Sequence, residues 1–211
     1  MAEAAAAWLG RSPFRPGETV AAAPAVALPE VPARYGFHAT LRAPFRLAHG
    51  TTERDLLRHF AQFAAARPPL RPVLSIAPLS RFLAFRSADR AIDKAARATM
   101  EAFDRMRAPL SDAERARRQV DRLDGRELEL LNRWGYPYVM DRYVFHMTLS
   151  GPLDAGGLTE VTAAARAHFG PLDGAPHPLI HAVYREDEPG RPFTVIATQD
   201  AVDDDKPDPA H

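Results

Sequence analysis

Two stretches of the sequence repeat one pair of side chains that can do chemistry, a histidine followed two positions later by a threonine. His38 and Thr40 lie in "YGFHATLRAPF", and His146 and Thr148 lie in "YVFHMTLSGPL", 108 residues further along. At that offset 6 of the 11 positions are identical, in a chain with only 8 histidines among 211 residues. Such a repeat indicates a duplicated element whose shared side chains have a shared task.

Paired His-x-Thr units suit an in-line displacement at phosphorus. A neutral imidazole can take a proton from water while a protonated one gives a proton to the leaving oxygen, because histidine titrates near neutrality. Threonine hydroxyls can donate to the non-bridging oxygens, which carry charge in the transition state. We therefore predict His38 and His146 as catalytic residues and Thr40 and Thr148 as substrate-binding residues. Either histidine could be the acid, and no metal or other cofactor is predicted.

Each motif copy is expected to lie on a β-strand. Residues two apart share a strand face, so the histidine and threonine of one copy point the same way. The alternate positions, such as Phe145, Met147 and Leu149, are apolar and are expected to pack on the core. Tyr35 and Tyr143 precede the histidines by three positions, which predicts core or rim places for both.

Three arginines next to the motif copies could reach a substrate phosphate, a contact that suits a planar guanidinium. Arg42 follows His38 by four positions, on the same face of a regular strand, and is the best candidate. Arg34 and Arg142 are more simply interpreted as solvated residues at strand ends.

Both halves of the chain predict the same order of elements after the motif strand, namely one helix and two strands. The predicted elements are helix Thr51–Arg67 and strands Arg71–Leu79 and Arg81–Ser87, then helix Leu158–Phe169 and strands His177–Asp187 and Arg191–Gln199. Two helical segments, Ala88–Arg107 and Asp112–Gly135, lie between the halves.

The predicted fold is therefore of the α+β class, a single bilobed domain over residues 1–199. Its two β-α-β-β lobes, about 34–88 and 141–199, are related by a pseudo-twofold axis, and a helical insert of about 89–135 joins them. The proline-rich segment 21–33 predicts an irregular connector. Residues 200–211 are acidic and nearly without apolar side chains, so a disordered tail is expected there.

The motif stretches resemble a known superfamily. "FHATL" and "FHMTL", one in each half, are similar to the His-x-Thr pairs of the 2H phosphoesterases, which include RNA 2′,3′-cyclic phosphodiesterases. The longer stretches "RYGFHATLRAPFRL" and "RWGYPYVMDRYVFHMTLSGPL", with "AWLGR" near the start, resemble the DUF1045 family, whose genes are often labelled as phosphonate metabolism proteins. The resemblance implies the bilobed 2H fold, with His38 and His146 as acid and base and Thr40 and Thr148 on the phosphate.

The phosphonate label suggests a substrate, 5-phosphoribosyl 1,2-cyclic phosphate, whose strained ring such an enzyme could open by analogy. The predicted function is thus that of a hydrolase, a metal-independent phosphodiesterase acting on a small cyclic phosphodiester. Two alternatives stay open. One is an RNA or nucleotide 2′,3′-cyclic phosphodiesterase, and the other is a non-catalytic module that binds a phosphate ligand.

Composition limits the partners and the place of the protein. The 27 basic residues balance the 27 acidic ones, which argues against binding of long nucleic acids. No apolar run approaches the roughly 18 residues of a membrane span, and the start does not have the pattern of a secretory signal. A soluble, cytoplasmic protein is expected. The chain has no cysteine, so disulfides and thiolate chemistry are excluded, and the sequence does not fix the oligomeric state.

Other histidines are expected to be structural or on the surface. His177 and His181 are four apart, a spacing that faces one ligand from a helix but not from the strand predicted here, so a metal role is not favoured. The aromatic residues of "RWGYPY" could stack on a base, but are expected to anchor the insert.

One expectation concerns the start of the chain. Members of the family are expected to begin with a short apolar strand before the helix that ends in "WLGR", whereas this sequence opens at "MAEAAAAWLG". We expect the true start to lie upstream, so that a form extended in the same reading frame melts higher and turns over faster. The alternative is that Thr19–Leu28 or another segment supplies the strand.

Overall fold

The computed structural model describes residues 1–18, 20 and 30–199, so the acidic tail 200–211 and most of the connector 21–33 lie outside the described residues, as does nearly all of Thr19–Leu28. The chain divides into two compact units. Unit 1 comprises Met1–Ala39, Ala64–Ala88 and His146–His211, and unit 2 comprises Thr40–Phe63 and Asp89–Phe145. Helices and antiparallel sheets are mixed in the chain, which confirms the α+β class, while the bilobed 2H arrangement and its boundaries stay predictions.

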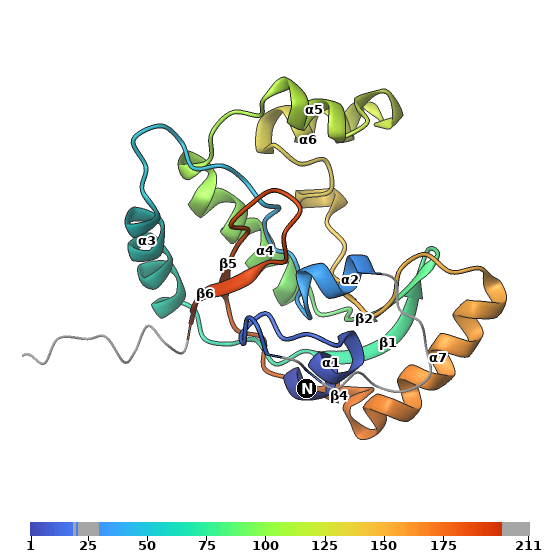
Figure 1. Ribbon diagram of the computed structural model, residues 1–211. Coiled ribbons are helices and arrows are strands. Elements are labelled where there is room, and N and C mark those ends of the chain that lie inside the picture. The colour runs from blue at the N-terminus through green and yellow to red at the C-terminus, as the bar shows by residue number, and fades with distance from the viewer. Residues whose placement is uncertain (19, 21–29, 200–211) are drawn as a thin grey trace, which may run out of the picture. The chain divides into compact units, whose positions relative to one another are not determined.

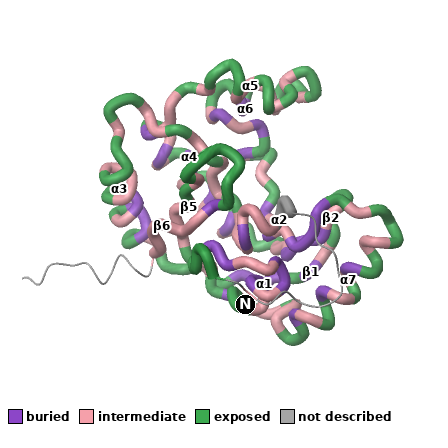
Figure 2. Tube along the Cα trace, viewed as in Figure 1, coloured by how far each residue is buried: buried purple, intermediate pink, exposed green. Residues whose placement is uncertain are grey.

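Unit 1 is built on a four-stranded antiparallel sheet of order β3-β2-β1-β4 (Figure 1). The strands are β1 (Val73–Leu79), β2 (Phe82–Arg86), β3 (Met147–Thr148) and β4 (Ala175–Pro176). Alternate residues of β1, Leu74 and Ile76, are buried, whereas three consecutive residues of β2 are buried (Figure 2). The register pairs Phe85 of β2 with Met147 of β3, so strands from the two halves of the chain join in one sheet.

Two helices of unit 1 pack together beside this sheet. α7 (Ala155–Phe169) buries Val161, Ala165 and Phe169, which are four apart and form one helix face. The ring of Phe169 meets Phe85 edge-on, at 5.0 Å between centroids. Trp8 of α1 (Ala2–Leu9) lies 5.7 Å from Phe169, so the N-terminal helix extends the same core.

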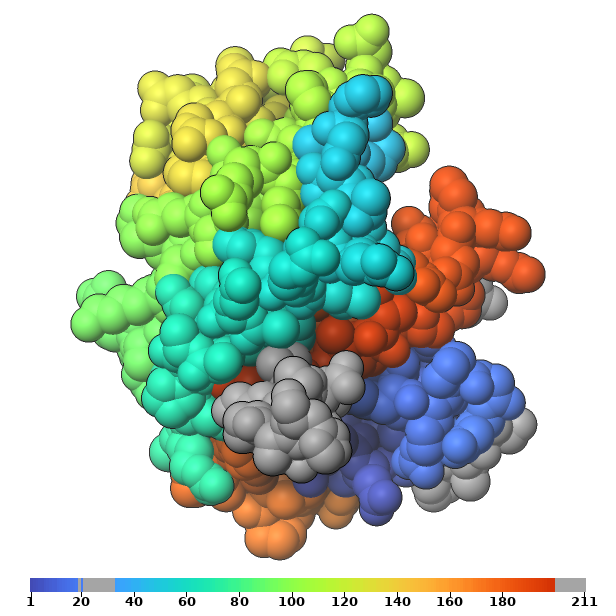
Figure 3. Space-filling view, turned by 90° about the vertical axis from the view of Figure 1, so that its left-hand side faces the viewer, coloured from blue at the N-terminus to red at the C-terminus, as the bar shows by residue number. Residues whose placement is uncertain are grey.

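A second sheet of unit 1 is the hairpin of β5 (Ala182–Arg185) and β6 (Thr194–Thr198). The turn that joins them contains Gly190 at φ +91°, in the predicted place. The N-terminal segment lies beside this hairpin, blue against red in Figure 3, where Val195 N donates to Pro13 O at 2.9 Å. The short helix α2 (Glu30–Tyr35) ends next to β6, because Phe193 N donates to Arg34 O at 3.1 Å.

Unit 2 contains most of the remaining helices. They are α3 (Glu53–Ala65), whose last two residues belong to unit 1, α4 (Arg90–Phe103), α5 (Asp112–Arg117) and α6 (Gly125–Trp134). Three 3-10 turns also belong to unit 2, namely η1 (Asp104–Met106), η2 (Val120–Arg122) and η3 (Met140–Arg142). A fourth, η4 (Gly170–Leu172), belongs to unit 1. Local sequence determines where α5 and α6 begin, because Ser111 and Asp124 each form a complete capping box. Met100, Leu130 and Val139 form a small core.

Most predicted elements are confirmed, but several differ. Residues 30–33 of the connector that was expected to be irregular lie in helix α2, and the predicted strand His177–Asp187 is reduced to the four residues of β5. The helical segment Asp112–Gly135 is broken into α5, η2 and α6, because Gln119 adopts a left-handed φ of +49° and Asp124 caps a new helix. The motif strands are much shorter than expected: β3 has two residues, and Ala39 makes an isolated bridge. In the described part of the chain, no helix is both long and apolar enough to cross a bilayer.

Candidate active site

One backbone pairing brings the two motif copies together. Ala39 forms an antiparallel bridge with Met147, which is itself paired with Phe85 of β2. One step along that antiparallel register, His38 lies opposite Thr148. His38, His146 and Thr148 thus belong to unit 1 and come from neighbouring strand segments, although 108 residues separate the two histidines.

The predicted packing face of the second copy is confirmed. Phe145, Met147 and Leu149 are 5%, 7% and 0% exposed, so the alternate positions of this stretch face the interior. His146 and Thr148 are partly exposed, as expected for residues on the other face. Local alternation therefore turns the imidazole and the hydroxyl of this copy away from the core.

His38 is held by a main-chain carbonyl and two tyrosines. Its Nδ1 lies 3.1 Å from Gly36 O. Because a carbonyl only accepts, Nδ1 carries the hydrogen, and the neutral ring keeps its lone pair on Nε2. The imidazole is stacked on Tyr35, at 5.7 Å between centroids and 24° between planes, and Tyr184 packs on it at 5.4 Å and 44°.

These surroundings favour neutral His38. Burial is the main cause that lowers the pKa of His38 below its ordinary value, and the charge of His146 lowers it further. The hydrogen bond to Gly36 O raises that pKa but does not outweigh the burial.

A glycine is required two positions before His38. Gly36 has φ +71°, and a Cβ atom there would lie 2.7 Å from Pro13 Cδ. Tyr35 is the last residue of α2, so the turn at Gly36 both ends the helix and presents the carbonyl that His38 uses. The "YGFH" spacing thus has a structural reason.

The strand that carries His146 is fixed from two sides. Leu149 N donates to Leu83 O at 2.8 Å, and the buried Ser150 Oγ accepts from Leu83 N at 2.9 Å. Trp8 Nε1 donates to Leu149 O at 2.8 Å in a buried contact, which gives the tryptophan of "AWLGR" a role. The His146 ring meets Phe82 edge-on at 5.7 Å, so its surroundings differ from the tyrosines around His38.

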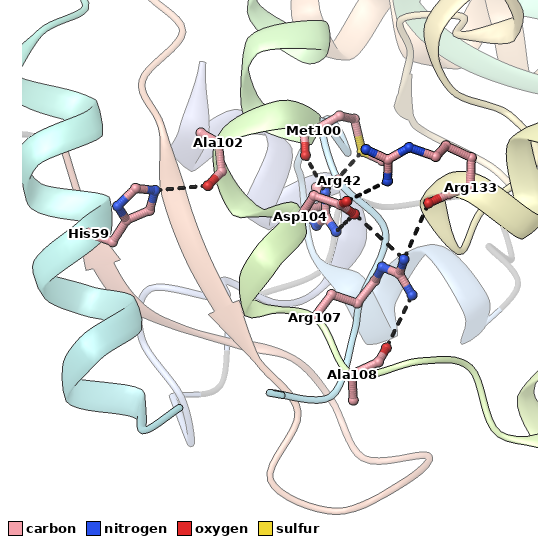
Figure 4. A network of polar contacts seen from close by, with 8 residues as sticks. All are labelled: Arg42, His59, Met100, Ala102, Asp104, Arg107, Ala108 and Arg133. Atoms are coloured by element: carbon pink, nitrogen blue, oxygen red, sulfur yellow. Dashed lines mark hydrogen bonds and ion pairs between the residues drawn. The ribbon is translucent and has the colours of Figure 1, made fainter. Parts of the chain in front are cut away.

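The other two predicted site residues lie in unit 2. Thr40 is its first residue and is exposed. Arg42 lies beyond any regular strand, so the argument that it shares a strand face with His38 does not apply. Its side chain is 6% exposed, and its guanidinium donates to Met100 O at 2.6 Å and pairs with Asp104 at 3.4 Å (Figure 4). Binding of substrate by Thr40 and Arg42 stays a prediction.

The remaining candidates have structural partners. Arg34 pairs with Glu186, and Arg142 pairs with Asp124 at 2.8 Å. His177 Nε2 contacts Leu172 O at 2.8 Å, in line with a structural role. Within the described ranges, no three His, Cys, Asp or Glu side chains are grouped to hold a metal ion.

Sequence reasoning missed Tyr184 and Arg11. Burial raises the pKa of Tyr184 to about 12, and the charge of Arg11 acts on the same phenol. Arg11 donates to the main-chain oxygens of Ala33, Arg34 and Phe193. The repeat gives no signal for Tyr184, because the position 108 residues earlier is Ile76, whereas Arg11 could have been found as the last residue of "AWLGR".

Comparison with known proteins places the chain in a family. The sequence profile described as "Protein of unknown function (DUF1045)" matches residues 40–194, so the chain belongs to the DUF1045 family. It is 38% identical over 208 residues to "Ribose 1,5-bisphosphate phosphokinase PhnN" of Janthinobacterium sp. (strain Marseille), with 91% of this chain and 46% of that protein covered. The protein of the same name from Laribacter hongkongensis (strain HLHK9) is 38% identical over 205 residues, covering 89% and 45%.

The chain thus spans about half the length of these curated relatives. No solved structure matches it.

Proposed function

We propose that this protein is a metal-independent phosphodiesterase of the 2H type that opens a small cyclic phosphodiester. The observation that carries the proposal is the bridge between Ala39 and Met147, because it holds two histidines of different surroundings in one unit. General acid and base catalysis at phosphorus needs two such groups, one neutral and one protonated at the same pH.

The reaction follows from that pair. Water attacks phosphorus in line with the ring oxygen that leaves. One histidine takes the water proton as the new P–O bond forms, and the other gives its proton to the ring oxygen as the old P–O bond breaks. The product is a phosphate monoester with one new hydroxyl, and one water is consumed. The hydroxyl of Thr148 donates to a non-bridging oxygen, which supports the transition-state charge, and Thr40 has this role in the other copy.

The substrate we propose is 5-phosphoribosyl 1,2-cyclic phosphate. Breaking its bond between phosphorus and O2 yields ribose 1,5-bisphosphate, the compound in the name of the two relatives. A protein that contains both activities would make this compound and use it. This chemical link supports the proposed substrate. The match covers less than half of each relative, so it does not show which part of the relative carries the activity in its name.

We do not propose the phosphokinase activity that the relatives are named for. The best known phosphate-binding loop of kinases has the pattern G-x-x-x-x-G-K-[ST]. The only two lysines, Lys94 and Lys206, do not follow a glycine, so this pattern is not in the chain.

The test is an assay of the purified protein by ³¹P NMR. It compares 5-phosphoribosyl 1,2-cyclic phosphate with a nucleoside 2′,3′-cyclic phosphate, each with and without EDTA. We expect the first to be opened to ribose 1,5-bisphosphate, unchanged by EDTA. Preference for the nucleotide would support the RNA or nucleotide alternative, and binding without turnover would support a binding module. Loss of activity in EDTA, restored by a divalent ion, would contradict the metal-independent mechanism.

A further inference from the structure

The two histidines do not have equivalent surroundings. His38 contacts the rings of both Tyr35 and Tyr184, and its Nδ1 lies within hydrogen-bond distance of Gly36 O. The ring contact of His146 is with Phe82. Since hydrolysis needs one base and one acid, this difference can decide which histidine has which task.

We propose that His38 is the general base, that His146 is the general acid, and that Gly36, Tyr35 and Tyr184 are the positioning residues that hold His38 in that role. The assignment rests on the proposed function and deepens it. Opening of the cyclic diester then begins with transfer of the water proton to His38 Nε2 and ends with transfer of a proton from His146 to the leaving oxygen.

The tautomer of His38 is the first argument. A base must present a lone pair, and the contact between Nδ1 and Gly36 O leaves the lone pair on Nε2. The stacked ring of Tyr35 and the tilted ring of Tyr184 restrict the plane of the imidazole, so Nε2 keeps one direction. A ring fixed in this way can accept a proton without first having to reorient.

The charges around His38 are the second argument. Tyr184 stays neutral at working pH because burial raises its pKa to about 12, so it provides no anion that would favour an imidazolium. Burial is the main cause that disfavours a proton on His38 and lowers its pKa, and the electrostatic influence of His146 lowers that pKa further.

Leaving-group chemistry tests the two roles. The ring oxygen of a cyclic ribose phosphate leaves as a basic alkoxide and needs the acid, whereas p-nitrophenolate leaves without a proton. We expect His38→Ala to lose roughly 10²- to 10⁴-fold on both the cyclic diester and methyl p-nitrophenyl phosphate. His146→Ala should lose as much on the cyclic diester but stay within about tenfold of the unaltered protein on the nitrophenyl ester. The reverse pattern, or equal losses on both esters, would overturn the assignment.

Histidine NMR tests the positioning even if no ester is cleaved. In the protein labelled with ¹⁵N at histidine, we expect His38 to carry its hydrogen on Nδ1 and to titrate below about 6.5. Spectra of His38→Ala and His146→Ala assign the two signals. A hydrogen on Nε2, or a His38 that is protonated at pH 7, would overturn the inference. Failure of the proposed function gives a different result, namely no cleavage of any cyclic phosphate with the His38 titration as expected.

Variants at Tyr184 separate positioning from general stability. Tyr184→Phe keeps the ring, so it should leave the His38 titration and the pH profile nearly unchanged. Tyr184→Leu removes the ring and admits water, so the pKa of His38 should rise and the acid limb of the rate profile should move to higher pH. The matched control is Phe14→Leu, which removes an aromatic ring that is 45% exposed in the same unit. A Tyr184→Leu protein that lowers the rate equally at every pH would show a merely structural role.

Discussion

The first and second copies of the His-x-Thr motif are nearly identical in sequence but are supported differently. The second copy lies between β2 and the bridge to Ala39, and Leu149 is tied to Trp8 and Leu83. The first copy follows the turn at Gly36 and lies at the sheet edge, where α2 and the β5–β6 hairpin supply its aromatic contacts. A duplicated motif thus provides two like groups, and unlike surroundings allow them to differ in protonation.

The largest loss of activity is expected on removal of the two histidines, singly or together. His38→Ala and His146→Ala should each reduce kcat/KM on the cyclic diester by roughly 10²- to 10⁴-fold. If the two proton transfers occur in one step, kcat/KM of the double variant should be only slightly lower than that of the less active single variant. The reason is that the effects of removing groups that act as a unit are not additive. Initial rates measure this, with circular dichroism to show that the variants are folded. Losses that multiply in the double variant would indicate independent roles.

A smaller loss is expected at Thr148. Thr148→Ala removes a donor to the transition state and should cost about 10²-fold in kcat, at the low end of the loss expected for one such donor and less than the loss at either histidine. Thr148→Ser is the matched control, because it keeps the hydroxyl and should retain most activity. If the serine variant is as inactive as the alanine variant, the methyl group and its packing matter, and the hydroxyl role is wrong.

Gly36→Ala tests the support of the first copy. A methyl group at φ +71° and 2.7 Å from Pro13 should lower the free energy of unfolding by at least about 2 kcal/mol and move the carbonyl that His38 uses. Gly17→Ala is the control in the same unit, since Gly17 has φ +82° with no atom within 4 Å of the added Cβ. That variant should lose only about 1 kcal/mol and keep its activity. Equal effects in urea unfolding would show that the contact with Pro13 is unimportant.

The parts of the fold that local sequence encodes were predictable. Apolar spacing gave α3, α4 and α7, and the hairpins β1–β2 and β5–β6 followed from short strands around turns. The duplicated motif identified His38 and His146, and their place in one unit agrees with a shared site, although their catalytic roles stay a prediction. Patterns of this kind depend on neighbours within a few residues, which is why they can be seen in one sequence.

The parts that depend on contacts between distant segments were not predictable. The pairing of β2 with β3 joins the two halves of the chain, and no local pattern specifies it. Tyr184 is about 146 positions from His38, and the repeat has no aromatic residue at the matching place. The prediction for Arg42 assumed a regular strand that continues past His38. The strand pairing is instead limited to an isolated bridge at Ala39, and the guanidinium of Arg42 contacts Met100 and Asp104.

The smallest effect on activity is expected from Trp8, which supports the second copy from behind. Trp8→Phe keeps most of the ring that packs on Phe169 but removes the donor to Leu149 O, leaving a buried carbonyl without that bond. The free energy of unfolding should fall by roughly 1–3 kcal/mol, while kcat changes less than about threefold, because Leu83 still holds the strand.

The only other tryptophan, Trp134, provides the matched control. It lies in unit 2 with Arg133 4.1 Å over its ring, so Trp134→Phe should cost about 1 kcal/mol or less. Urea unfolding followed by circular dichroism compares the two variants without depending on tryptophan fluorescence. If Trp8→Phe is as stable as the unaltered protein, the bond to Leu149 does not secure the second copy. If it instead abolishes turnover while remaining folded, the second copy is as sensitive to its support as the first, and the contrast between them is smaller than the contacts suggest.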